Sequence, residues 1–345
     1  MKSVVVHAPN KYSVEETPKP KPPPGGLLVK VSACGLCGSD LRTLQWGHRK
    51  VNLPWIIGHE ICGVIVETGR DYQGPWQIGQ KICIGPLAYC SLCEFCKKGQ
   101  YEYCLNYEEI GQKWPGGLAE FIAIPQECVS LGNILPLPEG LDVTLGTLVE
   151  PLSSCINSHE KGGGTSDKDI VVFGAGPLGC LHTGLARANG AKRITVIDRN
   201  PPRLHAALEL GADEVIDNST PNYKDSLQVI TKGNGADLVI LAAPSPDAFR
   251  QALQVAKRGG VILLFAGFPQ ELATFNADIN LIHYQALHVI GTTIFAPTHY
   301  QKALRLISSK KIPFEKIIIR FLLSDFESGA RLALERKIVK AVFLT

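Results

Sequence analysis

The hydrophobic and polar positions in the first half of the chain fall into short runs that glycines and turn residues interrupt. Runs of this kind cover residues 3–6, 27–32, 61–67, 78–84 and 116–124. Short, closely spaced apolar runs rich in β-branched residues are typical of strands joined by tight turns. The pattern therefore predicts that residues 1 to about 150 form a mostly β, partly barrel-like domain.

The pattern changes after about residue 152, where continuously apolar runs alternate with helical stretches. Residues 169–173 form an apolar run, a helical stretch follows to Ala188, and a second apolar run covers 193–197. Continuously apolar strands separated by helices indicate a parallel, doubly wound sheet. The remaining predicted strands are 236–241, 260–265 and 286–290, and the remaining predicted helices are 201–210, 222–232 and 246–258.

The last part of the chain, from about 291 to 345, is less regular. It contains one predicted helix at 300–309 and short β-prone runs that end at 338–344. We expect this part to return to the first domain. The predicted organisation is a mostly β domain at 1–152, a doubly wound domain at 153–291 and a returning segment at 292–345.

Composition excludes several classes of function. The 345 residues include 35 Lys and Arg and 32 Asp and Glu, and the net charge of +3 is too small for a nucleic-acid-binding surface. No apolar run reaches the length of about 18 residues that spans a bilayer, and residues 1–12 lack the apolar core of a signal peptide. These features predict a cytoplasmic protein of enzyme size, without nucleic-acid or membrane partners. Its eleven cysteines are then expected to be reduced.

Four cysteines lie within fifteen positions, at Cys90, Cys93, Cys96 and Cys104. Four thiolates can close a tetrahedral shell around Zn²⁺ with no open position, so the spacing predicts a structural zinc lobe at about 86–106. An iron–sulfur cluster is a second interpretation. The bacterial ferredoxin pattern, however, ends with a three-residue gap and a proline, and here the last gap is seven residues with no proline after it. Disulfides or free thiols are a third interpretation, although cysteines this close on one loop rarely reach disulfide geometry.

A glycine-rich turn, Gly174-Ala175-Gly176-Pro177-Leu178-Gly179, follows the predicted strand 169–173 and opens a helix. The first glycine permits a tight turn, the second lets the backbone approach a pyrophosphate, and the third permits close helix–strand packing. Asp198 ends the next strand, where a carboxylate accepts hydrogen bonds from the adenosine ribose and repels a 2′-phosphate. This context predicts a site that prefers NAD over NADP, although Arg199 can soften the preference. The expected cofactor-binding residues are Gly174, Gly176, Pro177, Leu178, Gly179, Asp198 and Arg203.

Cys37, His59, Glu60 and Glu150 are candidates for a second metal site. Taken alone, each has an ordinary structural explanation, as a small core residue, a hydrogen-bonded core histidine, a surface acid and a helix-start acid. A cysteine, a histidine and a carboxylate in a protein that also binds a dinucleotide match the ligand set of catalytic zinc. Such a site keeps one position open for water or substrate.

These motifs resemble the zinc-dependent medium-chain dehydrogenase/reductase superfamily, and within it the sorbitol (polyol) dehydrogenase-like branch. The resemblance covers essentially the whole chain. It implies an α/β protein with a GroES-like, mostly β catalytic domain and a Rossmann domain, two zinc ions per chain, and NAD as the cofactor. The motifs occur in the family's order and spacing: Cys37-Gly38-Ser39-Asp40, Gly58-His59-Glu60, the four-cysteine lobe, Val149-Glu150-Pro151-Leu152 and Gly174 to Gly179.

The resemblance implies a role for each candidate. Cys37 and His59 are zinc ligands, Glu60 is a permanent or alternating ligand, and Glu150 binds the zinc or its water. Ser39 occupies the position of the proton-relay hydroxyl, so that Ser39, His59 and Glu150 form the catalytic site. The implied reaction transfers hydride between NAD and a secondary alcohol of a polyol or sugar-derived substrate. Family members associate through the edge strand of the Rossmann sheet, which implies a homodimer or a homotetramer.

Two departures from the family pattern bear on the substrate. Arg42 stands where many members have a histidine that continues the proton relay, and arginine does not shuttle a proton at neutral pH. The relay then ends at water or uses another group, such as the nearby His48. Polyol dehydrogenases also often have an arginine after the glycine that ends the last Rossmann strand, and here Thr292 follows Gly291.

Several alternatives therefore stay open. The segment 45–50 contains aromatic and basic residues that either rim the pocket or form a solvated loop, and a basic rim leaves a phosphorylated polyol or an amino acid as substrate. An L-threonine 3-dehydrogenase shares the zinc motifs but usually has Asp where Glu150 stands here. A member that only binds dinucleotide is a third possibility, which the loss of Cys37 or His59 would favour, and both are present.

Overall fold

A computed structural model describes residues 1–220 and 233–345. The helix predicted at 222–232 therefore lies outside the described residues. Among the helices that are described, none is long and apolar enough to cross a membrane.

The chain divides into two compact units. Unit 1 comprises Met1–Ser153, Phe295–Ser309 and Ile318–Thr345, and unit 2 comprises Ser154–Ile294 and Lys310–Ile317. Residues 310–317 thus belong to unit 2, whereas the sequence-based division assigned all of 292–345 to the first domain.

Unit 1 is built mainly from strands. They are β1 (Lys2–Ala8), β2 (Lys11–Glu16), β3 (Leu27–Gly35), β4 (Trp55–Ile56), β5 (Glu60–Thr68), β6 (Lys81–Ile84), β7 (Leu87–Ala88), β8 (Glu108–Glu109), β9 (Phe121–Ile124), β10 (Ile134–Pro136), β17 (Ile318–Leu322) and β18 (Lys340–Leu344). Its helices are α1 (Gly38–Trp46), α2 (Glu94–Lys97), α3 (Gln126–Val129), α4 (Val143–Gly146), α11 (Pro297–Ser308) and α12 (Phe326–Leu334), with short 3-10 turns η1 (Tyr101–Tyr103) and η4 (Leu323–Asp325). Helix α5 (Val149–Lys161) begins in unit 1 and continues into unit 2.

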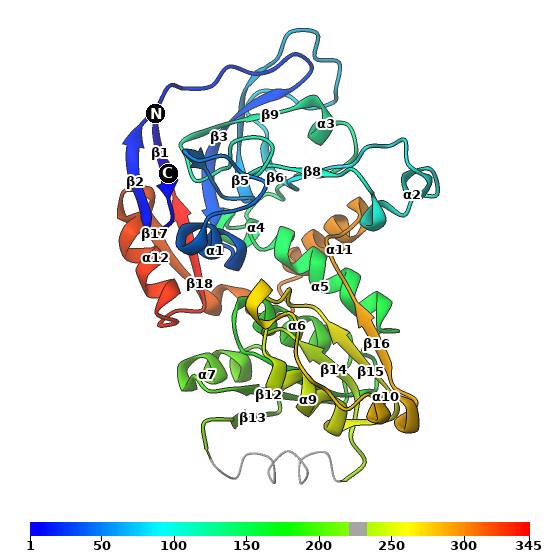
Figure 1. Cartoon of the computed structure of the whole chain (residues 1–345). Helices are drawn as coiled ribbons and strands as arrows, with labels where there is room; N and C mark the ends of the chain where they lie inside the picture. The colour runs from blue at the N-terminus through cyan, green and yellow to red at the C-terminus, as the bar shows by residue number, and fades with distance from the viewer. Residues whose placement is uncertain (221–232) are drawn as a thin grey trace. The chain divides into compact units, whose positions relative to one another are not determined.

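One seven-stranded sheet organises unit 1, in the order β10-β6-β5-β3-β18-β17, with β9 also paired to β3. Strand β3 is antiparallel to β5, with Gly35 opposite Glu60, and antiparallel to β18, with Gly35 opposite Val342. A strand from late in the chain, red in Figure 1, therefore lies beside one of the earliest strands, blue in the same figure. This register brings three distant stretches of sequence to one end of the sheet.

The core of unit 1 forms where the inward faces of these strands meet. Leu27, Val29 and Val31 of β3 are buried members of one hydrophobic cluster. They alternate along the strand, as expected when one face of a strand packs into the core. Phe326 and Phe343 join the same cluster with their ring centroids 4.9 Å apart, so the returning segment is held by the same core.

Unit 2 contains a parallel sheet of six described strands in the order β13-β12-β11-β14-β15-β16. The strands are β11 (Asp169–Phe173), β12 (Arg193–Asp198), β13 (Glu214–Asp217), β14 (Ala236–Leu241), β15 (Ala256–Leu264) and β16 (His288–Gly291). The described helices are α6 (Pro177–Ala188), α7 (Pro201–Glu209), α9 (Pro246–Val255) and α10 (Ile279–Gln285), with 3-10 turns η2 (Gln270–Leu272) and η3 (Phe314–Ile317). The predicted fold class, a mostly β domain plus a doubly wound parallel-sheet domain, is confirmed.

The strand order reverses at the centre of the unit 2 sheet. From β11 the chain steps to β12 and β13 on one side, and from β14 it steps to β15 and β16 on the other. Because crossovers between parallel strands are right-handed, the helices of the two halves cover opposite faces. Helices α6 and α7 pack on β11 to β13, and α9 and α10 pack on β14 and β15 (Figure 1). The carboxyl ends of β11 and β14 therefore mark the switch point at which doubly wound folds bind ligands.

Two of the differences from the sequence-based prediction have a clear physical cause. The helix predicted at 246–258 ends at Val255, because Ala256 already pairs with Ala236 of the neighbouring strand. A second helix, α12, lies in the returning segment, where only one was predicted. Its interior Gly329 weakens the helical signal in the sequence, but a Cβ at that position would lie 2.7 Å from the ring of Phe343. Packing against the sheet therefore explains both the helix and its glycine.

Candidate metal centres and dinucleotide site

Three strand ends converge in unit 1. Continuing the antiparallel register past Gly35 places Cys37 near the start of β5, where His59 and Glu60 lie. The register on the other side of β3 places Cys37 opposite Lys340, at the start of β18. Pairing of β5, β3 and β18 thus assembles a group of side chains from positions that are far apart in the sequence.

The candidate ligands Cys37, His59 and Glu60 form a compact group. One ligand atom from each side chain lies within 4.8 Å of the other two. His59 and Glu60 are 8% and 1% exposed, and Cys37 is partly buried. A sulfur, an imidazole nitrogen and a carboxylate oxygen at this spacing fit the donor set of a zinc site with a fourth position for another ligand.

Asp40 is a buried acid that orders this group, and it was absent from the set predicted from the sequence. Its Oδ2 accepts a hydrogen bond from the backbone N–H of Cys37 at 3.0 Å. Its Oδ1 accepts one from the backbone N–H of Gly58 at 3.2 Å and lies 3.5 Å from Nδ1 of His59. A carboxylate on one ring nitrogen fixes the orientation of a metal-binding histidine and leaves Nε2 for the metal.

The electrostatics of the group favour a cation. Burial lowers the pKa of His59, but the negative charges of Asp40 and Cys37 outweigh burial and raise that pKa well above its ordinary value of 6.5. Burial raises the pKa of Asp40, whereas the charge of His59 and hydrogen bonds from His59 and Cys37 lower it overall. The group therefore stabilises positive charge in its centre, which is the environment that a dication requires.

Lys340 supplies a buried counter-charge. Its side chain is 2% exposed, and its Nζ forms an ion pair with Oε2 of Glu60 and donates to the carbonyl oxygen of Leu36 at 3.0 Å. Burial lowers the pKa of Lys340, but the charges of Glu60 and Cys37 raise it overall, so the ammonium stays charged. Gly35 leaves room for the pair, because a Cβ there would lie 2.0 Å from Oε2 of Glu60.

Glu150 lies at the start of α5 and is half-buried. Burial and the neighbouring carboxylates of Glu60 and Glu109 raise its pKa to about 8, against the opposing charges of His59 and Lys340. Glu150 is thus close enough to interact electrostatically with the group. It is not a member of the compact set, however, in which Glu60 is the carboxylate.

Ser39 lies in the first turn of α1, next to the group. Ser39 and His59 line the same recess on unit 1, together with Asp40, Thr43, His48 and Gln112. The recess thus places a hydroxyl, a candidate metal ligand and a second histidine on one surface.

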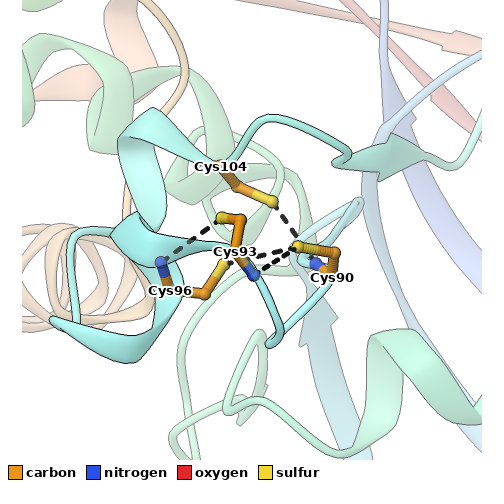
Figure 2. Close-up of side chains that lie close together, drawn as sticks. All are labelled: Cys90, Cys93, Cys96 and Cys104. Atoms are coloured by element: carbon orange, nitrogen blue, oxygen red, sulfur yellow. Dashed lines mark hydrogen bonds between the residues drawn. The ribbon is translucent and has the colours of Figure 1, made fainter.

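The four clustered cysteines form a second compact group, shown in Figure 2. Their sulfur atoms all lie within 4.8 Å of one another, and Sγ of Cys90 is 3.9 Å from Sγ of Cys96. A tetrahedral zinc site with bonds of about 2.3 Å has sulfur–sulfur edges of about 3.8 Å, so the spacing fits zinc. All eleven cysteines are described and all are free thiols, so disulfides are not formed in this lobe.

Local backbone geometry positions these sulfurs. The N–H of Cys93 donates to Sγ of Cys90 at 3.4 Å, and the N–H of Cys96 donates to Sγ of Cys93 at 3.5 Å. Backbone donors lower the pKa of Cys90, and they lower that of Cys93 to about 6. Burial raises the pKa of Cys96 to about 12 and raises that of Cys104. Backbone donors therefore shift two of the four thiols toward the thiolate form that zinc binds.

The glycine-rich turn joins β11 to α6 in unit 2. Gly174 has a φ of +102°, a left-handed value that favours glycine, and a Cβ on Gly179 would lie 1.7 Å from the carbonyl oxygen of Gly174. A Cβ on Gly176 would meet only Nη1 of Arg203, at 3.8 Å, so the backbone is open on that side. Pro177 and Leu178 form the first turn of α6, which has no side-chain cap. An uncapped helix N-terminus behind a bare glycine fits a pyrophosphate.

Asp198, the last residue of β12, holds the same turn. Its Oδ2 accepts a hydrogen bond from the N–H of Ala175 at 2.7 Å. Its Oδ1 accepts from the N–H groups of Arg199 and Asn200, at 2.7 and 3.0 Å. A carboxylate has about four acceptor sites, so it can still accept from a ribose hydroxyl. The structure thus brings Gly176, Asp198 and Arg203 to one turn, and these residues fit a dinucleotide.

Comparison with known proteins identifies the class. Residues 23–138 match the alcohol dehydrogenase GroES-like domain, and residues 177–309 match the zinc-binding dehydrogenase family. An L-threonine 3-dehydrogenase of Pyrococcus furiosus is 32% identical over 316 residues, which cover 89% of this chain and 88% of that protein. The structure of galactitol-1-phosphate dehydrogenase from Escherichia coli matches with a TM-score of 0.90 at 26% identity and covers 100% of both chains. A protein of Sinorhizobium meliloti 1021, solved with NADP bound, matches with a TM-score of 0.89 at 28% identity, covering 100% of this chain and 99% of that one.

The chain belongs to the zinc-dependent medium-chain dehydrogenase superfamily and resembles its polyol dehydrogenases. It is an oxidoreductase that acts on small-molecule alcohols, with zinc and a nicotinamide dinucleotide as cofactors. The family resemblance and the enzyme class predicted from the sequence are therefore confirmed.

Proposed function

We propose that this enzyme transfers hydride between NAD and a secondary alcohol of a polyol or sugar-derived substrate. The observation that carries the proposal is the compact group of Cys37, His59 and Glu60. We assign the catalytic zinc to these three side chains, with Glu150 as a further group that binds the zinc or its water. We assign a structural zinc to the four-cysteine lobe, which gives two zinc ions per chain.

Each side chain of the site has a distinct task in this proposal. Zinc held by these side chains would polarise the alcohol oxygen and lower the alcohol pKa, and NAD bound at the glycine-rich turn would accept the hydride. Ser39 lines the recess beside His59, so its hydroxyl accepts the alcohol proton and passes it outward. Because Arg42 cannot accept that proton, the relay ends at water. Asp40 fixes the ring of His59, and Lys340 reduces the negative charge that the alcohol meets as it loses its proton.

The division into two zinc ions has a direct test. The compact Cys37 group keeps an open position, whereas the cysteine lobe is closed, so a chelator should remove the catalytic zinc first. Metal analysis during chelation should show activity falling to zero while about one zinc per chain remains. An enzyme that stays active after losing its more labile zinc would contradict this division.

The preference for NAD is supported by Asp198 at the glycine turn. Its carboxylate accepts hydrogen bonds from a ribose diol and repels a 2′-phosphate. The comparison protein with NADP bound supports NADP as the competing candidate, and Arg199 beside Asp198 supplies a cation for the phosphate. Steady-state kinetics with both cofactors decides between them. Equal or better turnover with NADP would refute the preference.

A second candidate function is the oxidation of L-threonine. It is favoured by the 32% identity to an L-threonine 3-dehydrogenase, whereas the match to galactitol-1-phosphate dehydrogenase favours a sugar-derived alcohol. A panel of polyols, inositols, sugar phosphates and L-threonine, followed by NADH formation, separates the two. Threonine as the best substrate by kcat/KM would replace the polyol proposal.

The assembly and location are also proposals. Strand β16 forms one edge of the described unit 2 sheet, and an edge strand offers unpaired backbone groups to a second copy. We propose a homodimer or homotetramer that forms there, to be tested by sedimentation of the zinc-loaded protein. Eleven free thiols favour the reducing environment of the cytoplasm.

A further inference from the structure

We propose that the substrate carries an anionic group, either a phosphate ester or a carboxylate, which the basic segment 42–50 binds beside the alcohol that is oxidised. This inference rests on the proposed function, because it takes the recess at Ser39 and His59 as the place where the alcohol reacts.

The charge of this segment is one-sided. Residues 41–59 contain Arg42, Arg49 and Lys50 and no Asp or Glu. The three side chains are exposed, and none of them forms an ion pair within the described parts of the chain. Elsewhere in unit 1, exposed cations do find carboxylates, as in the pair of Lys113 and Glu108 at 2.8 Å. The segment therefore concentrates positive charge that the described chain does not neutralise.

His48 connects this charge to the reactive recess. It lines the recess together with Ser39 and His59. Burial lowers the pKa of His48, and the positive charges of Lys50, Arg49 and Arg42 lower it further, against the opposing negative charge of Asp40. All three cations therefore act on a side chain that lines the recess, so their field extends to the place where we expect the substrate.

The local geometry also supplies a hydrogen-bond donor. The backbone N–H of Lys50 donates to Nδ1 of His48 at 3.2 Å. With Nδ1 accepting, the proton of the neutral ring is on Nε2, which can then donate to a ligand. The Nζ of Lys50 lies 5.1 Å from the ring centroid of Tyr107, and this contact restrains an otherwise exposed side chain. A donor and cations along one segment match the way proteins bind phosphate or carboxylate.

The carboxylates around this segment already have partners. Asp40 lines the same recess and opposes the three cations at His48, but its two oxygens accept hydrogen bonds from the backbone N–H groups of Cys37 and Gly58. Burial raises the pKa of Glu109, and the charges of His59 and Lys50 oppose that rise. Glu109 also accepts a hydrogen bond from Nε2 of Gln112 at 2.6 Å, so it already has a partner. Lys50 contacts His48, and His48 lines the same recess as His59, so the cation and the candidate metal ligand flank one recess.

The test uses matched pairs of alcohols with the zinc-loaded, full-length enzyme. One pair is a hexitol and its monophosphate, and the other is 2,3-butanediol and 2,3-dihydroxybutanoate, in which a carboxylate replaces a methyl group. We expect kcat/KM for one anionic member to exceed that of its neutral partner by about ten- to a hundredfold. The pair that shows the gain identifies the anion as phosphate or carboxylate. Equal kcat/KM within both pairs would overturn the proposal.

Two variants locate the effect. In Arg42→Gln and in Lys50→Met, KM for the preferred anionic substrate should rise by about tenfold, with KM for the neutral partner within about threefold. Lys11→Met is the matched control, because it removes one exposed cation of the same unit and leaves segment 42–50 intact. A rise in KM for the dinucleotide alone would mean that the cations serve the cofactor, and the proposal would fail.

A second readout separates this inference from the proposed function. If no alcohol of the panel is oxidised, the proposed function fails, but anion binding can still be measured by calorimetric titration with inorganic phosphate and with acetate. The wild type and Lys11→Met should bind one of these anions, and the double variant R42Q/K50M should bind it at least about tenfold more weakly. Equal binding by all three proteins, or binding by none, would refute the inference.

Discussion

The two compact candidate metal-binding groups of unit 1 are assembled in opposite ways. The cysteine lobe takes four sulfurs from fifteen consecutive positions, and backbone N–H groups within the lobe hold them. The group of Cys37, His59 and Glu60 takes its side chains from the ends of β3 and β5, and its partner Lys340 comes from β18. Only the register of a seven-stranded sheet brings these side chains together. The proposed closed zinc site is therefore local, whereas the proposed catalytic site, which keeps an open position, depends on the whole sheet.

The surroundings of the two groups differ as well. The donors of the lobe are four sulfurs, and two of those side chains are partly exposed. The Cys37 group includes the buried carboxylate of Glu60 and is flanked by the buried charges of Asp40 and Lys340. Such charges are costly to bury unless each one has a partner. We therefore expect the lobe to stabilise a loop, whereas the Cys37 group depends on a stable sheet to hold its buried charges in place. Variants can test this difference.

The largest expected effect is the loss of catalysis in Cys37→Ser. Without this thiolate the catalytic zinc is held weakly, so turnover should fall by about a thousandfold or more. The strands that carry the group remain, so circular dichroism should stay unchanged. Metal analysis should show that the zinc of the cysteine lobe is retained. Appreciable turnover in a variant shown to lack the second zinc would remove Cys37 from the catalytic site.

Lys340→Met should produce the next largest effect, on stability. It leaves the carboxylate of Glu60 buried without its ion-pair partner, which typically costs about 3–5 kcal/mol of unfolding free energy. Urea unfolding of unit 1, followed by tryptophan fluorescence, measures the loss. The double variant Glu60→Gln/Lys340→Met removes both charges and should recover much of it. If the single and double variants are equally stable, the charge of Glu60 does not depend on Lys340.

Acid is expected to weaken metal binding at both candidate zinc groups, because their ligands must be deprotonated. A second effect of acid, independent of metal, is expected in unit 2. In unit 2, Nε2 of His159 lies 2.9 Å from Nδ1 of His182, and both rings are buried. Burial lowers the pKa of His159 to about 3 and lowers that of His182 well below 6.5. Both rings are therefore neutral in the folded protein, while the unfolded chain takes up protons below about pH 6.5. The contribution of the two neutral rings to the free energy of unfolding is intact above that pH and is lost as the pH falls toward 3.

His159→Gln should therefore flatten the pH dependence of stability. Each such histidine costs about 1.4 kcal/mol of unfolding free energy per pH unit below 6.5, or about 2 kcal/mol between pH 6.5 and 5. Unfolding curves of the wild type and the variant, recorded with zinc and with a chelator, test this. The difference in slope should be the same in both conditions. Identical slopes in the two proteins would show that the histidine pair does not cause the acid sensitivity.

The smallest effect is expected for Cys96→Ser in the lobe. Removing one of four sulfurs loosens the loop at residues 90–104 while the core of unit 1 remains. Limited proteolysis should cut this loop roughly tenfold faster, which corresponds to about 1.4 kcal/mol of local opening. Turnover should fall by less than about threefold, because the Cys37 group is assembled elsewhere. A loss of activity as large as that of Cys37→Ser would mean that the two groups are not independent.

The sequence was most informative where a function is built locally. The cysteine spacing and the glycine turn after a buried strand can be recognised because their residues are neighbours in the chain. Asp40 was missed as an organiser of the group, although an acid three residues after Cys37 was a usable signal. Lys340 was missed because its partners are Glu60 and Leu36, and no local pattern encodes that register. A lone lysine at the start of the apolar run Ala341-Val342-Phe343-Leu344 was the only hint.

The same distinction explains the differences in the fold. Strand β11 was predicted with the bounds that it has, and helix α6 with its end at Ala188, because the change from a buried strand to a helix is visible in the sequence. The end of α9 was misplaced, since the pairing of Ala256 with Ala236 depends on a distant strand. The order of β5, β3 and β18 was likewise unpredictable, although it determines which side chains form the site.

The contact between Lys340 and Leu36 has a consequence for the order of events in the cell. The two residues are 304 positions apart. At the usual speed of translation, roughly 15 to 60 s pass between the synthesis of Leu36 and that of Lys340. During this time the nascent chain exposes Cys37, His59 and Glu60 without their lysine. We expect a metal ion that arrives early to meet a more negative and less selective site than the finished enzyme presents, so that zinc is best delivered after the last strand has joined the sheet.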